Sequence, residues 1–283
     1  MTERLADITA RLDGIRTLGS VVTAMNAIAG ARARNARDEI KAVDKYAATI
    51  NAAMVQMASA LNLSAVHTPG TARTALLVFG AEQGFAGAFS ERVFDSLDRN
   101  GAPYQLFLVG TRAEAVAAFR NMAPAWSTAM PSHSASIPKF ADRLLQPIYK
   151  ELATGKIEKL DAVYSISESG KVRIDRLPLF PVRVSDAAPT QRSAPLLNMP
   201  TAQLLTQLGA DYMHAMVCRV ALHAFVTENE ARMSAMSMAQ RQIEKDISAL
   251  ETKERQVRQE AITAELIELS AGVQASRRRS PEE

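Results

Sequence analysis

The residues best placed for chemistry lie in a glycine-rich stretch, residues 80–87, which follows a short apolar run. A glycine turn between a strand and a helix is the setting in which backbone N–H groups hold the phosphates of a dinucleotide. The spacing here does not fit G-x-G-x-x-G, and no acidic residue ends a second strand to hold a ribose. We therefore expect this turn to shape a structural or protein-contact surface, with nucleotide binding as the lesser alternative.

Other residue types that carry chemistry lack suitable neighbours. The four histidines include no pair spaced by four residues and have no cysteine partner, so we expect no metal site. The chain has no G-x-S-x-G elbow and no phosphate loop, so neither serine hydrolysis nor P-loop chemistry is expected. The single cysteine, Cys218, lies among apolar residues and predicts a buried structural thiol, as in a reducing compartment. We expect no catalytic residue and no cofactor.

Charged residues predict solvated faces. Acidic residues of the last third alternate with basic ones, a pattern typical of helical ion pairs in water. The acidic set is Glu228, Glu230, Glu244, Asp246, Glu251 and Glu254. Near the start, Arg32, Arg34 and Arg37 form either a solvated basic face or a contact for an acidic protein surface. The net charge of +3 is too small to indicate nucleic-acid binding.

Two long segments at the ends of the chain must position these residues. Residues 204–272 contain no proline, and their apolar stripe is narrow and flanked by charge, so it needs a partner helix. Its first part repeats every seven residues, and its second part continues at spacings of three and four. The stripe comprises Met236, Ile243, Leu250, Val257, Ile262, Leu266, Leu269 and Val273.

The first segment, residues 5–61, carries a similar stripe whose middle is small or polar. These middle positions are Gly19, Asn26, Ala29, Ala33 and Ala36. Small residues allow two helix backbones to approach closely, and a polar seam residue fixes register. We expect the two terminal helices to pair antiparallel.

Residues between the two helices follow a different pattern. Apolar runs at 75–79, 104–109, 162–167 and 171–177 predict strands, the last two as a hairpin. Helices are expected at 89–100, 113–121 and 140–154, with Thr111 as a cap of the second. Five prolines between 178 and 200 predict an extended surface segment. We predict an α+β protein: a long antiparallel coiled coil with an inserted α/β, Rossmann-like domain, divided as 1–66, 67–200 and 201–283.

The ends of the chain also bear on its location. The N-terminus has no apolar stretch of the signal-peptide kind, and no run of eighteen apolar residues could span a bilayer. We expect a soluble protein, or one held at a membrane only through partners.

Two runs in the last third resemble the gamma subunit of F-type ATP synthases. Residues 227–236, TENEARMSAM, resemble S-E-x-x-A-R-M-x-A-M, and residues 258–272, RQEAITAELIELSAG, resemble R-Q-x-x-I-T-x-E-L-x-E-I-x-x-G. Residues 23–25, TAM, are similar to K-A-M, and residues 84–89, GFAGAF, to G-L-C-G-G-L. The resemblance extends over essentially the whole chain.

The resemblance implies a central-stalk rotor that has no catalytic site and couples rotation of the membrane c-ring to ATP synthesis or hydrolysis in the alpha3-beta3 head. It implies alpha, beta and epsilon subunits and the c-ring as partners, in a proton- or sodium-translocating complex at the cytoplasmic face of the bacterial inner membrane. It also implies contacts with the beta subunit through Met25, Arg232, Arg258, Gln259, Thr263 and Glu265.

The chain departs from this family at three places, one of which is Arg255, where the family has an asparagine three residues before the position of Arg258. Residues 16–23, RTLGSVVT, lack most lysines of the family's K-N-T-Q-K-I-T-K, and the chain extends into a basic tail, Arg277–Arg279. We therefore expect a divergent member, with weakened contacts to beta. The alternative is a non-rotary coiled-coil adaptor, and a nucleotide-using enzyme is a more remote one.

Overall fold

The computed structural model describes residues 5–60, 73–97, 103–168, 171–182 and 197–278. It divides into two compact units, one made of residues 28–234 and the other of residues 1–27 together with 235–283. Helices α1 (Leu5–Ala60) and α5 (Thr201–Arg278) each contribute to both units. The long terminal helices predicted from the apolar stripes are therefore confirmed.

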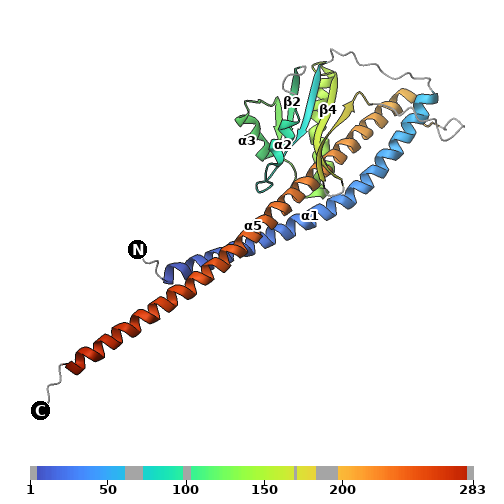
Figure 1. Ribbon diagram of the computed structural model, residues 1–283. Coiled ribbons are helices and arrows are strands. Elements are labelled where there is room, and N and C mark those ends of the chain that lie inside the picture. The colour runs from blue at the N-terminus through green and yellow to red at the C-terminus, as the bar shows by residue number, and fades with distance from the viewer. Residues whose placement is uncertain (1–4, 61–72, 98–102, 169–170, 183–196, 279–283) are drawn as a thin grey trace. The chain divides into compact units, whose positions relative to one another are not determined.

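A five-stranded sheet forms the centre of the larger unit (Figure 1). Its strands are β1 (Thr74–Phe79), β2 (Tyr104–Val109), β3 (Trp126–Thr128), β4 (Lys159–Glu168) and β5 (Lys171–Phe180). The order is β3-β2-β1-β4-β5; β1 to β4 are mutually parallel, and β5 pairs antiparallel with β4. This confirms a mostly parallel sheet with an antiparallel edge.

Helices cover both faces of this sheet, because alternate residues of the inner strands are apolar on both sides. Leu76 and Val78 of β1 pack in one cluster with residues of α2 (Phe89–Asp95) and α3 (Thr111–Phe119). Leu77 and Phe79 pack in the other cluster, with α4 (Ile137–Ala153), α5 and α1. A three-residue 3-10 helix, η1 (Ser134–Ser136), precedes α4.

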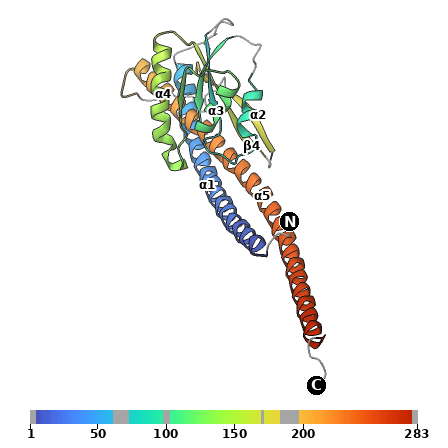
Figure 2. The same cartoon turned by 90° about the vertical axis from the view of Figure 1, so that its left-hand side faces the viewer.

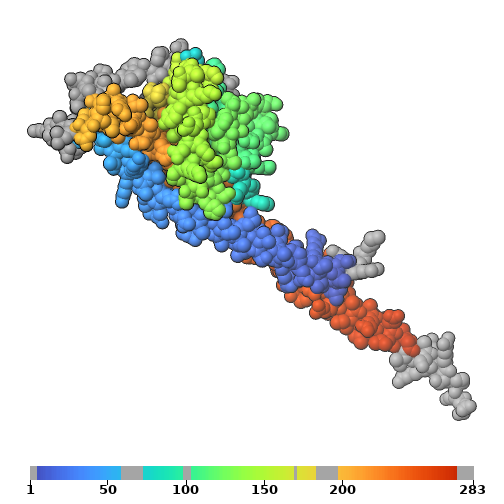
Figure 3. All heavy atoms as spheres, turned by 180° about the vertical axis from the view of Figure 1, so that it is seen from behind, coloured from blue at the N-terminus to red at the C-terminus, as the bar shows by residue number. Residues whose placement is uncertain are grey.

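Within the larger unit, α1 runs beside α5 and beside α4 (Figures 2 and 3). Ala36 and Ala47 of α1 belong to the same buried cluster as Val217 and Ala221 of α5. The register is antiparallel, because Asp44 pairs with Arg219 whereas Arg37 pairs with the later residue Glu230. The predicted antiparallel pairing is therefore confirmed here.

Three local predictions differ from the structure. The N-cap of α3 is Gly110, with φ of 114°, and Thr111 is the first helical residue. An added Cβ at Gly110 would lie 2.7 Å from the carbonyl oxygen of Ala81, so a glycine is required. Pro178 was expected in an extended return segment but lies in β5, an edge strand, where a missing N–H is tolerated.

The remaining difference concerns α2, which ends at Asp95 instead of near 100. The predicted hairpin turn at 169–170 and the proline-rich residues 183–196 lie outside the described residues.

Candidate functional site

The smaller unit is held by a short apolar contact between α1 and α5. Val22, Met236 and Ile243 are buried together, and Met25 packs against them while remaining partly exposed. Met25 is thus a member of the helix-helix contact, with part of its side chain open to solvent. The seven-residue repeat had placed Met236 and Ile243 on one face, and this is confirmed.

The seam of this contact is made by small and polar side chains. A Cβ added at Gly19 would lie 3.3 Å from Cγ2 of Ile243, so the two backbones approach closely. Asn26 Nδ2 donates to Ser237 Oγ at 3.5 Å, and its Oδ1 is buried without a hydrogen-bond partner among the described residues. Arg16 pairs with Glu251 at 2.8 Å on the surface. The antiparallel register therefore also holds within this unit.

Four of the other five predicted contact residues, all except Arg232, lie on the distal part of α5 and are exposed. Arg258 pairs with Glu254 at 2.8 Å, one helical turn earlier. Thr263 Oγ1 donates to the carbonyl oxygen of Gln259 at 2.8 Å. Glu265 completes the set. The structure therefore places these four on one short stretch of helix, well separated along the chain from Arg232.

Large apolar side chains are exposed along the same stretch. The exposed fractions are 53% for Ile262, 62% for Leu266, 65% for Ile267 and 61% for Leu269. We expected the whole stripe of α5 to pack against the first helix. Within the described residues this is wrong beyond Val257, because α1 is the shorter helix and begins at Leu5.

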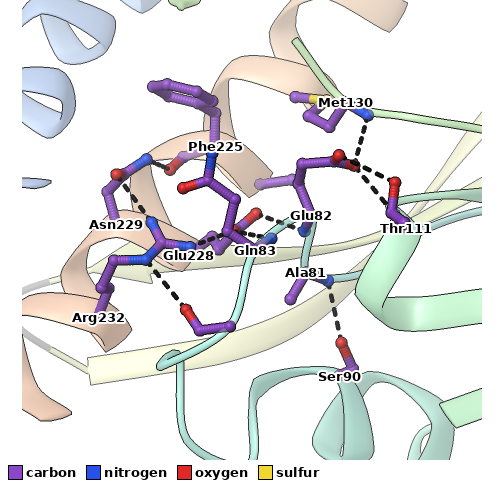
Figure 4. A network of polar contacts seen from close by, with 12 residues as sticks. Ala81, Glu82, Gln83, Ser90, Thr111, Met130, Phe225, Glu228, Asn229 and Arg232 are labelled. Carbon is purple, nitrogen blue, oxygen red and sulfur yellow. Dashed lines mark hydrogen bonds and ion pairs between the residues drawn. The ribbon is translucent and has the colours of Figure 1, made fainter. Parts of the chain in front are cut away.

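Arg232 has a different environment from the other predicted contact residues, because it is only 5% exposed. Figure 4 shows it within a network of polar contacts. Its guanidinium pairs with the Glu228 carboxylate and donates to Asn229 Oδ1 at 3.0 Å. Its Nε donates to the carbonyl oxygen of Gly84 at 3.2 Å. Arg232 therefore joins α5 to the glycine-rich loop after β1.

Glu228 completes this connection. Its carboxylate accepts the backbone N–H of Glu82 at 3.0 Å and that of Gln83 at 3.1 Å. We expected Glu228 on a solvated face, and this is wrong: it is 4% exposed. The alternating charge pattern could not show this, because the partners are backbone groups almost 150 residues away in sequence.

Glu82 makes a second set of bonds from the same loop. Its carboxylate accepts the N–H of Thr111 at 2.9 Å, the Thr111 hydroxyl at 2.9 Å and the N–H of Met130 at 2.8 Å. Ser90 Oγ accepts the N–H of Ala81 at 3.0 Å. The loop is therefore fixed to α5, α2, α3 and the segment after β3.

The loop also carries an unusual residue. Phe85 has φ of 61° and is 67% exposed, and Gly87 has φ of 58°. Positive φ is costly for a bulky residue, so the surrounding bonds must hold the loop in this conformation. The predicted role of this stretch as a structural or contact turn agrees with these bonds.

Cys218 is 3% exposed, and burial raises the pKa of its thiol to about 12. The expected buried thiol is confirmed. We expected no cysteine partner for a histidine, and this is wrong for His214, one helical turn earlier, whose ring nitrogens lie 3.9 Å from the Cys218 sulfur. Burial, followed by the charge of Arg219, lowers the pKa of His223.

The described residues offer neither a metal site nor a membrane-spanning helix. No group of three or more His, Cys, Asp or Glu side chains there could hold a metal ion. Among the helices in that part of the chain, none is both long and apolar enough to cross a bilayer.

Of the arginines near the start, Arg37 pairs with Glu230 of α5.

Comparison with known proteins identifies one family. The sequence model described as ATP synthase matches residues 4–275. The ATP synthase gamma chain of Renibacterium salmoninarum is 28% identical, over 93% of this chain and 94% of the relative. That of Kineococcus radiotolerans is also 28% identical, over 97% of both chains.

Solved structures show the same fold. A rotor chain of the Euglena gracilis mitochondrial ATP synthase superposes with a TM-score of 0.61 at 17% identity, covering 91% of this chain and 98% of the other. A central-stalk chain of the Tetrahymena thermophila mitochondrial ATP synthase superposes with a TM-score of 0.56 at 16% identity, covering 77% and 99%.

Proposed function

This chain belongs to the ATP synthase family, as a non-catalytic gamma chain of the central stalk, and we propose that its helix pair turns inside a head of alpha and beta subunits. In this role it couples rotation of the membrane c-ring to ATP synthesis or hydrolysis. A single asymmetric rotor makes different contacts with each surrounding beta subunit, so otherwise equal sites acquire different nucleotide affinities. By reciprocity, nucleotide exchange at those sites drives the rotor.

The observation that carries this proposal is the exposed apolar stretch of α5. Ile262, Leu266 and Leu269 are more than half exposed, and they follow one another at helical spacing. Exposed apolar side chains that recur on one helix face mark an interaction site. The stretch lies within the region matched by the ATP synthase family, so the partner we propose is the head.

We propose that Met25, Arg258, Gln259, Thr263 and Glu265 contact the beta subunit. Support comes from the exposure of the last four, from the partial exposure of Met25 and from the family segments in which all five lie. The sixth residue, Arg232, is held by Glu228, Asn229 and Gly84. A direct contact of Arg232 with beta requires the guanidinium to leave these groups.

We assign the other parts of the complex by the same reasoning. We propose that residues 67–200 form the foot domain, which carries the epsilon subunit and the c-ring, and that it lies in sequence between an N-terminal part, residues 1–66, which contains α1, and a C-terminal part, residues 201–283, which contains α5. The chain reaches the membrane only through these partners. Because the relatives compared above are bacterial gamma chains, we place it at the cytoplasmic face of the bacterial inner membrane.

Co-expression with the alpha and beta chains of the same organism tests the proposal. We expect one copy of this chain to co-purify with an alpha3-beta3 core, and a bead attached to the foot domain to rotate when ATP is added. If alpha and beta assemble and hydrolyse ATP while this chain elutes alone, the proposal is wrong. A complex that assembles but shows no rotation would instead favour the non-rotary adaptor.

A further inference from the structure

The carboxyl ends of β1 and β2 form the edge of the sheet at which doubly wound proteins bind their ligands. Backbone N–H groups of the loop after the first strand, and of the helix after the second, commonly hold an anion there. In this chain the corresponding groups are the N–H groups of Glu82 and Gln83 after β1 and of Thr111 at the start of α3. All three are occupied by carboxylates of the chain itself.

The first carboxylate comes from α5. Each oxygen of Glu228 accepts one N–H of the loop, from Glu82 and Gln83, and one oxygen also meets the guanidinium of Arg232 (Figure 4). Glu228 and Arg232 are 4% and 5% exposed. Two converging N–H groups with a buried cation form a complete anion site.

The second carboxylate comes from the loop itself. Glu82 accepts the N–H and hydroxyl of Thr111, at the positive end of α3, and the N–H of Met130. The two sites are linked, because the residue that supplies this carboxylate also donates its N–H to Glu228.

We propose that the carboxyl edge of this sheet is an anion-binding edge whose ligands are the chain's own carboxylates, Glu228 and Glu82, and that Glu228 thereby fixes the register of α5 on the sheet. The proposal concerns the contact between α5 and the sheet and does not depend on the rotary function. The chemical class of ligand is a carboxylate or another small oxyanion.

The need for such a site follows from the contact between α5 and the sheet. That contact is made by buried apolar residues of α5, among them Val217, Val220, Ala221 and Ala224. Apolar burial supplies most of the adhesion but is non-directional, and small side chains resist a one-turn slide weakly. Two backbone hydrogen bonds and an ion pair require one particular placement of Glu228, so they select the register.

The bonds from the loop N–H groups to Glu228 also explain why the glycine-rich loop is not expected to bind a nucleotide. Its donors point to a carboxylate that is covalently part of the chain and needs no association from solution. A phosphate could enter only after Glu228 had left. Glu228 therefore makes these backbone N–H groups unavailable to a nucleotide phosphate.

The first experiment measures amide hydrogen exchange in the purified full-length chain. In Glu228→Ala the amides of Glu82 and Gln83 lose a charge-assisted acceptor, and we expect their exchange to accelerate about tenfold or more. The matched control is Glu230→Ala, on the same helix, which removes a carboxylate paired with Arg37. The two loop amides should exchange in this control as in the unsubstituted chain.

The second experiment is chemical rescue. Glu228→Ala removes the atoms of an acetate ion from the site, so sodium acetate should restore protection of the two amides and raise the thermal midpoint. Sodium chloride at equal ionic strength should do neither, and Glu230→Ala should not respond to acetate. If Glu228→Ala only loosened the structure and left no anion site, acetate and chloride would have the same effect.

Two results would overturn the proposal. One is unchanged protection of the Glu82 and Gln83 amides in folded Glu228→Ala. The other is an acetate effect no larger than that of chloride. If Glu228→Ala does not fold, Glu228→Gln keeps the shape and offers one acceptor oxygen. Protection of one amide should then be lost, and retention of both would contradict the proposal.

Discussion

At the scale of single residues, Glu228 and Arg232 form an ion pair in which both side chains are buried. Its side chains are 5% and 6% exposed, so each charge would be uncompensated without the other. A buried pair adds little net stability compared with apolar residues, but removing one partner is costly because the other stays buried. Surface pairs such as Arg16–Glu251, at 54% and 38% exposure, lack this property.

Substitution of Arg232 tests this reasoning. We expect Arg232→Ala to lower the free energy of unfolding by about 3 kcal/mol, because Glu228 keeps only its two backbone donors. Urea denaturation of the full-length chain measures the change. The control Arg16→Ala should cost less than about 1 kcal/mol. Equal losses in the two variants would show that the Arg232 pair is no different from a surface pair.

His223 should give the stability a pH dependence. Burial lowers its pKa from 6.5, so the folded chain takes up a proton less readily than the unfolded chain. Above pH 6.5 the ring is neutral in both states and contributes nothing. As pH falls below 6.5 the unfolded chain is protonated first, so stability decreases. In His223→Gln, the urea midpoint measured between pH 8 and pH 5.5 should fall less than in the unsubstituted chain.

At the scale of elements, the pairing of α1 with α5 depends on small side chains. Ala29, Ala33 and Ala36 are each 1% exposed or less, so little space remains between the helices. A Cβ added at Gly30 would lie 3.3 Å from Nη1 of Arg34, which is a tight contact, and 3.5 Å from Cε of Met233. Close packing of this kind tolerates extra volume poorly.

Enlarging one of these alanines tests the packing. We expect Ala33→Leu to destabilise the chain by about 1–3 kcal/mol through overpacking. Ala31→Leu, on the exposed side of the same helix, should change stability by less than about 0.5 kcal/mol. Thermal unfolding followed by circular dichroism compares the two. A larger loss in Ala31→Leu would contradict the assigned face of α1.

The elements themselves could largely be predicted from the sequence. The three-and-four spacing of residues 5–61 predicts α1. The four apolar runs between the helices predict four of the five strands. Both predictions succeed because the periodicity of apolar residues follows from burial. The short strand β3 was missed, since Trp126–Thr128 has no alternation to detect. The roles of Glu228 and Glu82 could not be predicted, because both bind backbone groups that only the tertiary fold brings near.

At the scale of the whole molecule, the distal part of α5 leaves large apolar side chains exposed. The motif at residues 258–272 could be related to a family from sequence, but the stripe alone could not show where internal pairing ends. The structure shows this end directly through Ile262 and Leu266. The side chains of the basic tail, Arg277–Arg279, lie outside the described residues, so their role remains a prediction.

Polar substitution of the exposed apolar stretch of α5 tests assembly separately from folding. The double substitution Leu266→Asn with Leu269→Asn should leave the thermal midpoint of the free chain nearly unchanged, because both side chains are already exposed. It should reduce the amount of alpha3-beta3 core that co-purifies. Phe119→Asn, at an 88% exposed position of α3, is the matched control and should assemble normally. Equal recovery of the core with both variants would argue against docking through this stretch.

The inaccessibility of Cys218 has a practical consequence for optical measurements. It is the only cysteine in the chain, and its thiol is buried with a pKa raised to about 12, so maleimide dyes should label it slowly in the native state. A cysteine introduced at the exposed position of Phe119 would then be the single fast-reacting thiol. A fluorophore could be attached there without first removing a native cysteine.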